Sequence, residues 1–149
     1  MSAADAALRP YTTEVAEEWI DYNGHLSEAY YVLVFGFTTD RIMVDLGLDA
    51  DYRAATGCSL YTVEAHVRYL REVPRGATLQ VTPRVVASGA KKLHLAYEMH
   101  VGGELVATEE IMALHVDGSG AAPFPAAIAE RIEALPAAVP EWSGRRIGA

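Results

Sequence analysis

A carboxylate stands in a glycine-containing turn just ahead of a long apolar segment. Asp21 opens the stretch Asp-Tyr-Asn-Gly-His-Leu-Ser-Glu, in which the Asn-Gly step predicts a turn. The first N–H groups of a following helix are unpaired and lie at the positive end of its dipole, where they can hold a developing oxyanion. A nucleophile or base beside such groups is the minimum requirement for acyl transfer. Asp is also common in Asx turns and helix caps, so the local pattern leaves a purely structural role for Asp21 open.

The segment after this turn has the features of a buried helix. From Ser27 to Leu46 the chain has no proline, and Gly47 stands where a helix usually ends. Residues 29–37 are apolar on every side, whereas a surface helix is apolar along one stripe only. We therefore expect a helix of about five turns, wrapped around its middle, whose second half regains a polar face.

Most of the remaining chain up to Asp117 shows the period of two that is typical of strands. Alternation is clearest over residues 59–70, where 60, 62, 64, 66, 68 and 70 are expected on one face. Pro83 best fits a sheet edge or a bulge. Further strands are predicted at 79–85, 93–101 and 105–115, an extended piece at 11–15, and hairpin connectors at 74–76, 88–90 and 102–103.

One buried helix followed by a run of antiparallel strands predicts an α+β fold, with a curved sheet folded around the helix. We expect a single domain over residues 1–149, with its core at about 11–117 and a C-terminal helix and tail at 118–149. Within that end, 126–135 are predicted to be helical and the chain after Pro140 a loose tail. Because open sheet edges favour pairing, we also expect two copies to associate through an edge strand.

Composition excludes several classes of protein. Twelve Lys and Arg against 20 Asp and Glu give a net charge of −8 over 149 residues, which disfavours binding to nucleic acid. The single cysteine, Cys58, has no partner for a disulfide or a thiolate metal site. Residues 1–8 lack the features of a signal peptide, and no apolar run is long enough to cross a membrane. We therefore expect a cytoplasmic protein that does not bind membranes.

A resemblance to a known family rests on three stretches of the chain. The Asp-x-x-Gly-His signature at Asp21 leads into an aromatic-rich helix, and an extended run ends in Tyr-Leu-Arg-Glu-Val at residues 69–73. Over roughly residues 13–117, this chain resembles the 4-hydroxybenzoyl-CoA-thioesterase branch of the hotdog-fold acyl-CoA thioesterases. Thr-Val-Glu-Ala-His at 62–66 and Lys-Leu-His-Leu at 92–95 are similar to the betainyl-CoA thioesterases of carnitine breakdown.

The resemblance implies roles for residues around the turn. Asp21 would attack the thioester carbonyl or activate a water, and the backbone N–H near Glu28 would face the oxyanion. His25 would orient Asp21 or the thioester, or would instead satisfy groups at the helix end, and Asn23 is placed among the substrate-binding residues. One departure is that Ser27-Glu28 stands where many relatives have Asn-Asn, so the role of those two residues is not carried over.

A betainyl group carries a trimethylammonium, which donates no hydrogen bonds and is best held by aromatic faces and negative charge. The aromatic candidates are Trp19, Tyr22, Tyr30, Tyr31, Phe35 and Tyr61. Tyr22, Tyr30 and Tyr61 are preferred because they are nearer the expected site, whereas Phe35 better fits the core. Glu64 would supply the charge and His66 a hydrogen bond if their strand face lines a cleft between subunits. Alternating polar residues usually mark a solvated strand face, which is the alternative for both residues.

Coenzyme A is anionic, so an acidic protein needs local basic groups to bind its phosphates. Arg68, Lys91 and Lys92 are the candidates, within a wider basic set that includes Arg71 and Arg75. The same side chains would also serve to keep sheet edges soluble. No spacing supports a metal site, and no cofactor is expected.

Together these features predict a thioesterase that converts a short-chain acyl-CoA, here betainyl-CoA, to the free acid glycine betaine and CoA. The sites are expected between the subunits of a homodimer or a tetramer of dimers. The alternatives are an acyl-CoA-binding module without catalysis and a thioesterase for another aromatic or short aliphatic acyl-CoA. A nucleophilic and a general-base role for Asp21 stay open, because both use the same carboxylate at contact distance.

Overall fold

The computed structural model describes residues 8–148, so the Ala-rich lead at 1–7 and residue 149 lie outside the described part. None of the helices within 8–148 is long and apolar enough to cross a membrane. The elements in chain order are β1 (Tyr11–Glu14), the short 3-10 helix η1 (Glu17–Trp19), α1 (Glu28–Leu46), α2 (Ala50–Thr56), β2 (Ser59–Tyr69), β3 (Thr78–Ser88), β4 (Lys92–Val101), β5 (Glu104–Asp117), β6 (Gly120–Ala121) and α3 (Ala126–Glu133).

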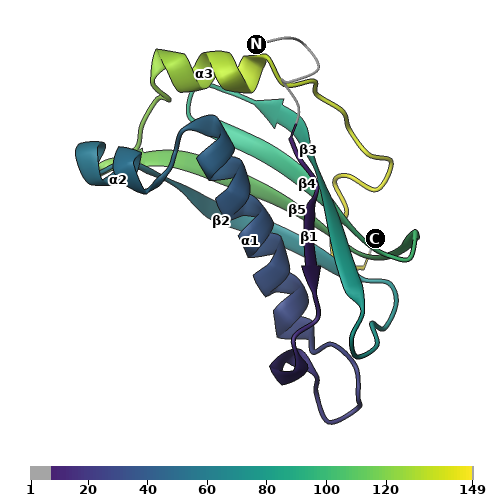
Figure 1. Ribbon diagram of the computed structural model, residues 1–149. Coiled ribbons are helices and arrows are strands. Elements are labelled where there is room, and N and C mark those ends of the chain that lie inside the picture. Colours follow the sequence, from purple (N-terminus) through teal and green to yellow (C-terminus); the bar gives the residue numbers. More distant parts are fainter. Residues whose placement is uncertain (1–7, 149) are drawn as a thin grey trace.

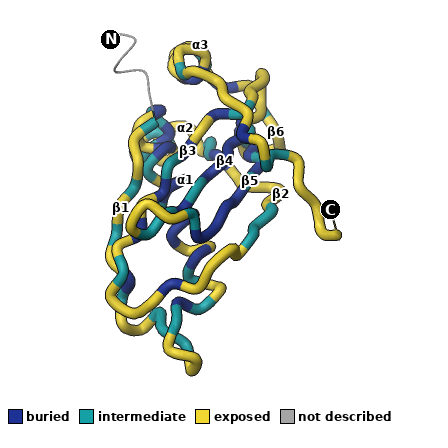
Figure 2. The backbone as a smooth tube through the Cα atoms, turned by 90° about the vertical axis from the view of Figure 1, so that its right-hand side faces the viewer, coloured by how far each residue is buried: buried dark blue, intermediate teal, exposed yellow. Residues whose placement is uncertain are grey.

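The strands form one antiparallel sheet in the order β1-β3-β4-β5-β2, with β6 added to β5. The sheet curves around α1, which crosses its concave side (Figure 1). Figure 2 shows buried segments gathered in the middle strands, while much of the outer strands and most connections are exposed. The predicted α+β architecture, a long helix held in a curved antiparallel sheet, is therefore confirmed.

Helix α1 begins and ends where the sequence predicts. Ser27 is its N-cap residue, and Gly47 closes it with a φ of 93°, a left-handed value that glycine adopts without strain. Toward the sheet, Phe35 stacks on Tyr97 with ring centroids 6.0 Å apart, and the Thr39 hydroxyl lies 2.7 Å from the Tyr97 hydroxyl. The side of α1 that faces away from the sheet carries side chains that remain exposed, namely Val32, Leu33 and Val44.

The sheet wraps the buried side of α1, as expected, and leaves the opposite side uncovered in one chain. The sheet covers only one side of α1, because a single curved sheet cannot enclose a helix completely. The exposed apolar side chains on the other side match the expectation of a second copy, which stays a prediction.

The connection between β2 and β3 also differs from the predicted hairpin. The two strands lie at opposite sides of the sheet, since β2 pairs with β5 while β3 pairs with β1 and β4. Residues 70–77 must therefore cross one end of the sheet. The connectors at 88–90 and 102–103 do join neighbouring antiparallel strands, as predicted. The predicted connector at 74–76 is as short as a hairpin loop, so its length did not reveal that the chain crosses one end of the sheet there.

Strand β2 does not keep one face throughout, contrary to the alternation of its sequence. Its pairing with β5 shifts between Thr62 and Glu64, which is a β-bulge. Thr62 lies opposite the buried Ala113 on the inner face, whereas Glu64 lies opposite Met112 on the outer face. The bulge therefore separates residues 60 and 62 from residues 64, 66 and 68, which the sequence had predicted on a single face.

The C-terminal segment packs on the sheet, so the expectation of a loose tail after Pro140 is wrong. The Trp142 indole Nε1 donates to Glu98 at 2.9 Å, and the Gly144 N–H donates to Glu110 at 2.7 Å. Helix α2 was not predicted at all, whereas α3 lies within the predicted range. Pro83 sits on β3 beyond Val81, where the pairing with β1 has ended, as expected for an edge.

Candidate active site

The turn that carries Asp21 is held by its own carboxylate. Oδ1 of Asp21 accepts hydrogen bonds from the N–H groups of Asn23 at 2.9 Å and His25 at 3.4 Å. Gly24 adopts a φ of 81° in this turn, which only glycine does readily. The structural role considered for Asp21, an Asx turn, is thus present. The hydrogen bonds of this turn use Oδ1, and within residues 8–148 Oδ2 accepts no hydrogen bond. The turn therefore holds the carboxylate in place while one of its oxygens stays free.

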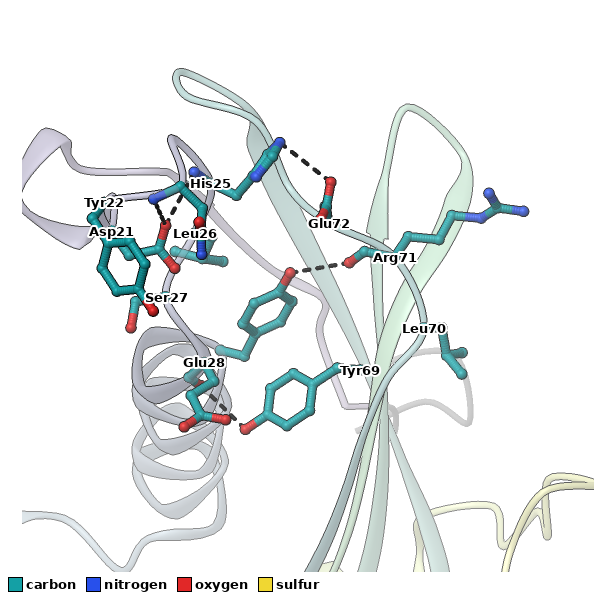
Figure 3. A pocket seen from close by; sticks show the side chains of 12 residues that line it. Asp21, Tyr22, His25, Leu26, Ser27, Glu28, Tyr69, Leu70, Arg71 and Glu72 are labelled. Atoms are coloured by element: carbon teal, nitrogen blue, oxygen red, sulfur yellow. Dashed lines mark hydrogen bonds and ion pairs between the residues drawn. The ribbon is translucent and has the colours of Figure 1, made fainter.

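Asp21 lies in the wall of a cavity of about 590 Å³ at one end of the molecule (Figure 3). One wall is the turn and the start of α1, and the other is the end of β2 with the chain that crosses to β3. The crossing chain is tied to the turn, because the Leu26 N–H donates to the Val73 carbonyl at 2.9 Å. The lining residues are Asp21, Tyr22, Asn23, His25, Leu26, Ser27, Glu28, Tyr31, Tyr69, Leu70, Arg71 and Glu72.

The start of α1 has a backbone N–H that is unpaired among the described residues, where the sequence predicts the oxyanion-binding group. Within residues 8–148, no hydrogen bond takes up the backbone N–H of Glu28, and the Ser27 side chain makes no cap hydrogen bond. The Glu28 carbonyl accepts from the Tyr69 hydroxyl at 3.2 Å, which ties the first turn to the end of β2. An unpaired N–H at the positive end of a helix dipole, next to a carboxylate, is suited to stabilise negative charge on a substrate oxygen.

Two tyrosines form the floor of the cavity. The rings of Tyr31 and Tyr69 meet edge to face with centroids 5.1 Å apart, and the Tyr31 hydroxyl donates to the Arg71 carbonyl at 3.0 Å. Burial raises the pKa of both phenols, and nearby acidic groups raise it further: chiefly Glu72 for Tyr31, and Glu28 and then Glu109 for Tyr69. Both hydroxyls therefore stay protonated at neutral pH and act as hydrogen-bond donors.

His25 does not direct its ring at Asp21. Its Nε2 lies 3.3 Å from Oε2 of Glu72, and the imidazole extends away from the Asp21 carboxylate (Figure 3). The contribution of His25 to the Asp21 turn comes from its backbone N–H. Contact with the thioester therefore stays a prediction for this side chain, as does the binding role of Asn23.

The predicted substrate residues on β2 lie on the outer face of the sheet. Glu64 and His66 line a second hollow of about 300 Å³, together with His94, Glu110 and the C-terminal segment at 144–146. Tyr61 and Arg68 project to the same face, since they lie opposite Leu114 and Thr108 of β5. One chain does not bring these four residues to the Asp21 cavity, so their binding roles stay predictions that need a second subunit.

Tyr30 and the two lysines are also apart from the cavity in one chain. The Tyr30 ring stacks on Trp19 with centroids 5.7 Å apart. Lys91 and Lys92 lie at the β3–β4 hairpin, where Lys92 pairs with Leu114 of β5. Leu114 also lies opposite Tyr61, near the start of β2, whereas the cavity is at the end of β2. Contact of the lysines with coenzyme A phosphates stays a prediction.

The lining residues outside the predicted site are Leu26, Ser27, Tyr31, Tyr69, Leu70, Arg71 and Glu72. Tyr31, on α1, belongs to the wider set of aromatic candidates, whereas Tyr69 and Glu72 had not been proposed for the site. Arg71 comes from the wider basic set, and its Nε pairs with Glu104 at 2.6 Å. The sequence signal of Tyr69 and Glu72 was indirect, because their place depends on where the crossing chain runs. Within residues 8–148, no three His, Cys, Asp or Glu side chains gather as a metal site would require.

Comparisons with known proteins agree with this geometry. The family model of the thioesterase-like superfamily matches residues 15–132. A betainyl-CoA thioesterase of Pseudomonas aeruginosa is 43% identical over 150 residues, covering 95% of this chain and 94% of the relative. An L-carnitine dehydrogenase/betainyl-CoA thioesterase of Agrobacterium fabrum is 49% identical over 115 residues, covering 76% of this chain but 24% of that longer protein.

Two solved structures match almost the whole chain. A Staphylococcus aureus protein solved in complex with CoA has a TM-score of 0.87 at 28% identity, covering 94% of each chain. A candidate thioesterase of Pseudomonas putida has a TM-score of 0.81 at 39% identity, covering 93% of this chain and 94% of that one. The protein therefore belongs to the thioesterase-like superfamily, has the hotdog fold, and is a thioesterase.

Proposed function

We propose that this thioesterase hydrolyses betainyl-CoA to glycine betaine and CoA, with Asp21 as the reacting carboxylate. One observation carries the site assignment: the Asp21 carboxylate and the unpaired N–H of Glu28 line the same cavity. The relatives named betainyl-CoA thioesterases support the choice of substrate, since one of them aligns with nearly the full length of this chain.

The chemistry follows from the fixed direction of the carboxylate. Two backbone N–H groups hold Oδ1 of Asp21, which leaves Oδ2 to act on the thioester. As a general base, Oδ2 takes a proton from water while the water oxygen bonds to the carbonyl carbon. As a nucleophile, it bonds to that carbon itself and forms a mixed anhydride, which water then hydrolyses. Both routes begin from the same placement of the carboxylate.

The helix start stabilises the intermediate of either route. As the carbonyl carbon becomes tetrahedral, its oxygen gains a negative charge that the Glu28 N–H can hold. When the C–S bond breaks, the electron pair leaves with sulfur, and the thiolate of CoA takes up a proton. Removal of one such donor typically costs about 10²–10³ in rate in other enzymes.

The proposal includes an assembly of at least two copies in the cytoplasm. Apolar side chains stay exposed on α1 and on the free strand β2, including Val44 and Val63 with more than half of their surface exposed. Antiparallel pairing of two β2 strands would cover this edge and form sites between subunits. Glu64, His66, Tyr61 and the basic candidates for CoA lie on the outer face, so their binding roles require a contact between copies that brings this face to a cavity.

Release of free thiol from a panel of thioesters tests the substrate directly. The panel contains betainyl-CoA, acetyl-CoA, a medium-chain acyl-CoA and 4-hydroxybenzoyl-CoA, each measured for kcat/KM. We expect a strong preference for betainyl-CoA. Equal hydrolysis of the neutral acyl groups would keep the thioesterase activity but reject betainyl-CoA as the substrate, and no thiol release from any of them would reject the proposed function.

A further inference from the structure

A buried carboxylate outside the catalytic turn has no partner. Glu109 lies on β5 between Val67 of β2 and Tyr97 of β4, so it shares the inner face of the sheet with these residues. Only 5% of its surface is exposed. Within residues 8–148, neither a hydrogen bond nor an ion pair reaches its carboxylate. Its unpaired oxygens still touch solvent, because among the described residues no fully enclosed side-chain oxygen lacks a partner. A carboxylate on a side chain buried to this extent is nonetheless normally paired.

Among the described residues, none offers a positive charge to Glu109. The titratable side chains nearest to it are Tyr97 on β4 and Tyr69 on β2, and helix α1 contributes Asp40 close to Tyr97. All three are neutral or acidic at neutral pH. Burial raises the pKa of Glu109 to about 7, because the charged form has lost water without gaining a partner. A cation that entered this region would therefore meet an uncompensated negative charge.

Glu109 stands directly behind one wall of the Asp21 cavity. Tyr69 lies opposite Ala107, and Val67 lies opposite Glu109, so Tyr69 and Glu109 are diagonal neighbours on one face. Such neighbours are typically about 7–8 Å apart at Cα, within reach of long and aromatic side chains. The other contacts of Tyr69 are with Tyr31 and the Glu28 carbonyl, both in the cavity wall. Tyr69 therefore hydrogen-bonds to the start of α1 and is a diagonal neighbour of Glu109, although Glu109 itself does not line the cavity.

We propose that Glu109 is the counter-charge that selects acyl groups carrying a quaternary ammonium, with the rings of Tyr69 and Tyr31 as the surface that receives it. The inference rests on the proposed function and deepens it. A quaternary ammonium has no N–H to donate, so it needs aromatic faces and a nearby negative charge rather than oriented acceptors. Attraction to a buried carboxylate is also less screened than attraction to a surface one. A neutral acyl group gains nothing from this arrangement.

The test compares betainyl-CoA with 3,3-dimethylbutanoyl-CoA, in which carbon replaces the quaternary nitrogen at nearly the same shape. The ratio of their kcat/KM values measures selection for charge alone. We expect Glu109→Gln to lower kcat/KM for betainyl-CoA by about 10- to 100-fold, which is about 1.4–2.7 kcal/mol, and to leave the neutral thioester unchanged or better hydrolysed. Glu98→Gln, the same substitution on the outer face, is the matched control and should keep the wild-type ratio.

The pH dependence of the same kcat/KM ratio distinguishes a charge effect from a structural one. If Glu109 only supported the fold, the ratio would not change with pH. In the wild type, the ratio should rise as pH increases through the range in which Glu109 ionises, and Glu109→Gln should abolish that rise. Equal loss of both activities in Glu109→Gln, or an unchanged ratio, would overturn the inference. A wild-type enzyme without preference for the charged thioester would instead reject the proposed substrate, which distinguishes the two failures.

Discussion

Two adjacent glutamates on β5 have opposite environments. Glu109 points to the inner face and has no hydrogen-bond partner within residues 8–148, whereas Glu110 points to the outer face and accepts from His94, Ser143 and the Gly144 N–H. Burial acts to raise the pKa of Glu110, but those hydrogen bonds outweigh it and lower the pKa, while burial alone raises that of Glu109 to about 7. The outer carboxylate therefore stabilises the fold, and the inner one destabilises it.

The two faces of the sheet differ in what their polar side chains do. On the outer face, polar side chains satisfy one another and hold the C-terminal segment. On the inner face and in the neighbouring cavity, Glu109, Oδ2 of Asp21 and the Glu28 N–H have no partner within residues 8–148. Asp21 and Glu28 are open to solvent, so their free groups are available to a ligand without a cost of burial.

The largest expected effect on stability concerns Glu109 and pH. Each tenfold change in proton affinity corresponds to about 1.4 kcal/mol, so a pKa of about 7 in place of 4.5 corresponds to about 3 kcal/mol. The raised pKa means that the folded state holds this proton more tightly than the unfolded state. The free energy of unfolding should therefore fall as pH rises from about 4.5 to about 7, with no further loss above.

Urea unfolding of the wild type and Glu109→Gln at pH 5 and pH 8 isolates this contribution, because other titrating groups are common to both proteins. The variant should lose about 2.5 kcal/mol less than the wild type between the two pH values, because part of the full change has already occurred at pH 5. An identical pH dependence in both proteins would show that Glu109 is not isolated.

Glu110→Gln should affect the free energy of unfolding in the opposite direction from Glu109→Gln, and by a smaller amount. The amide keeps one acceptor oxygen but turns its NH₂ toward donors, so it loses hydrogen bonds that a charged acceptor strengthens. We expect a loss of about 2 kcal/mol at pH 7, and the loss should shrink at low pH where the wild-type carboxylate is protonated. Unchanged unfolding at pH 7 would contradict the proposed role of Glu110 as an anchor.

The smallest effect is expected for Trp142→Phe, which tests the outer face without changing charge. The substitution removes the indole N–H that donates to Glu98, while Arg84 still bonds the same carboxylate at 3.2 Å. We expect a loss of about 1 kcal/mol and faster proteolysis after Pro140, with thioesterase activity unchanged. If Trp142→Phe changed neither the rate of proteolysis after Pro140 nor the free energy of unfolding, the packing of this segment on the sheet through Trp142 would be contradicted.

The features predicted correctly were those that local sequence encodes strongly. Long periodic segments and a terminal glycine predicted α1 and the main strands. Helix α2 was missed because it has seven residues and none of them is buried, although Asp49 caps its start and Gly57 its end. The bulge near Thr62 was invisible in a strictly alternating sequence, and it moved Glu64 and His66 to the outer face.

The clustering of Asp21, His25 and Glu28 in one cavity was predictable for the same reason, because these residues are close in sequence. The opposite wall was not, since Tyr69 and Glu72 reach the cavity only through the chain that crosses from β2 to β3. Glu109 looked like one of two charged residues in a strand. Only the register with Val67 and Tyr97 shows which of the two is buried.

The central claim is that the Asp21 carboxylate, and not merely its turn, carries the reaction. Asn keeps an oxygen that can accept from the Asn23 and His25 N–H groups, so Asp21→Asn preserves the turn and removes the charge. Asp49→Asn is the matched control, since Oδ1 of Asp49 likewise accepts a backbone N–H, from Tyr52 at 2.9 Å, outside the cavity.

The most direct measurement is kcat for thiol release from betainyl-CoA by these two variants and the wild type. We expect kcat to fall by about 10²–10⁴ in Asp21→Asn with normal unfolding, and to keep its wild-type value in Asp49→Asn. Retention of most of the activity by a folded Asp21→Asn protein would contradict the central claim and leave Asp21 with its turn alone.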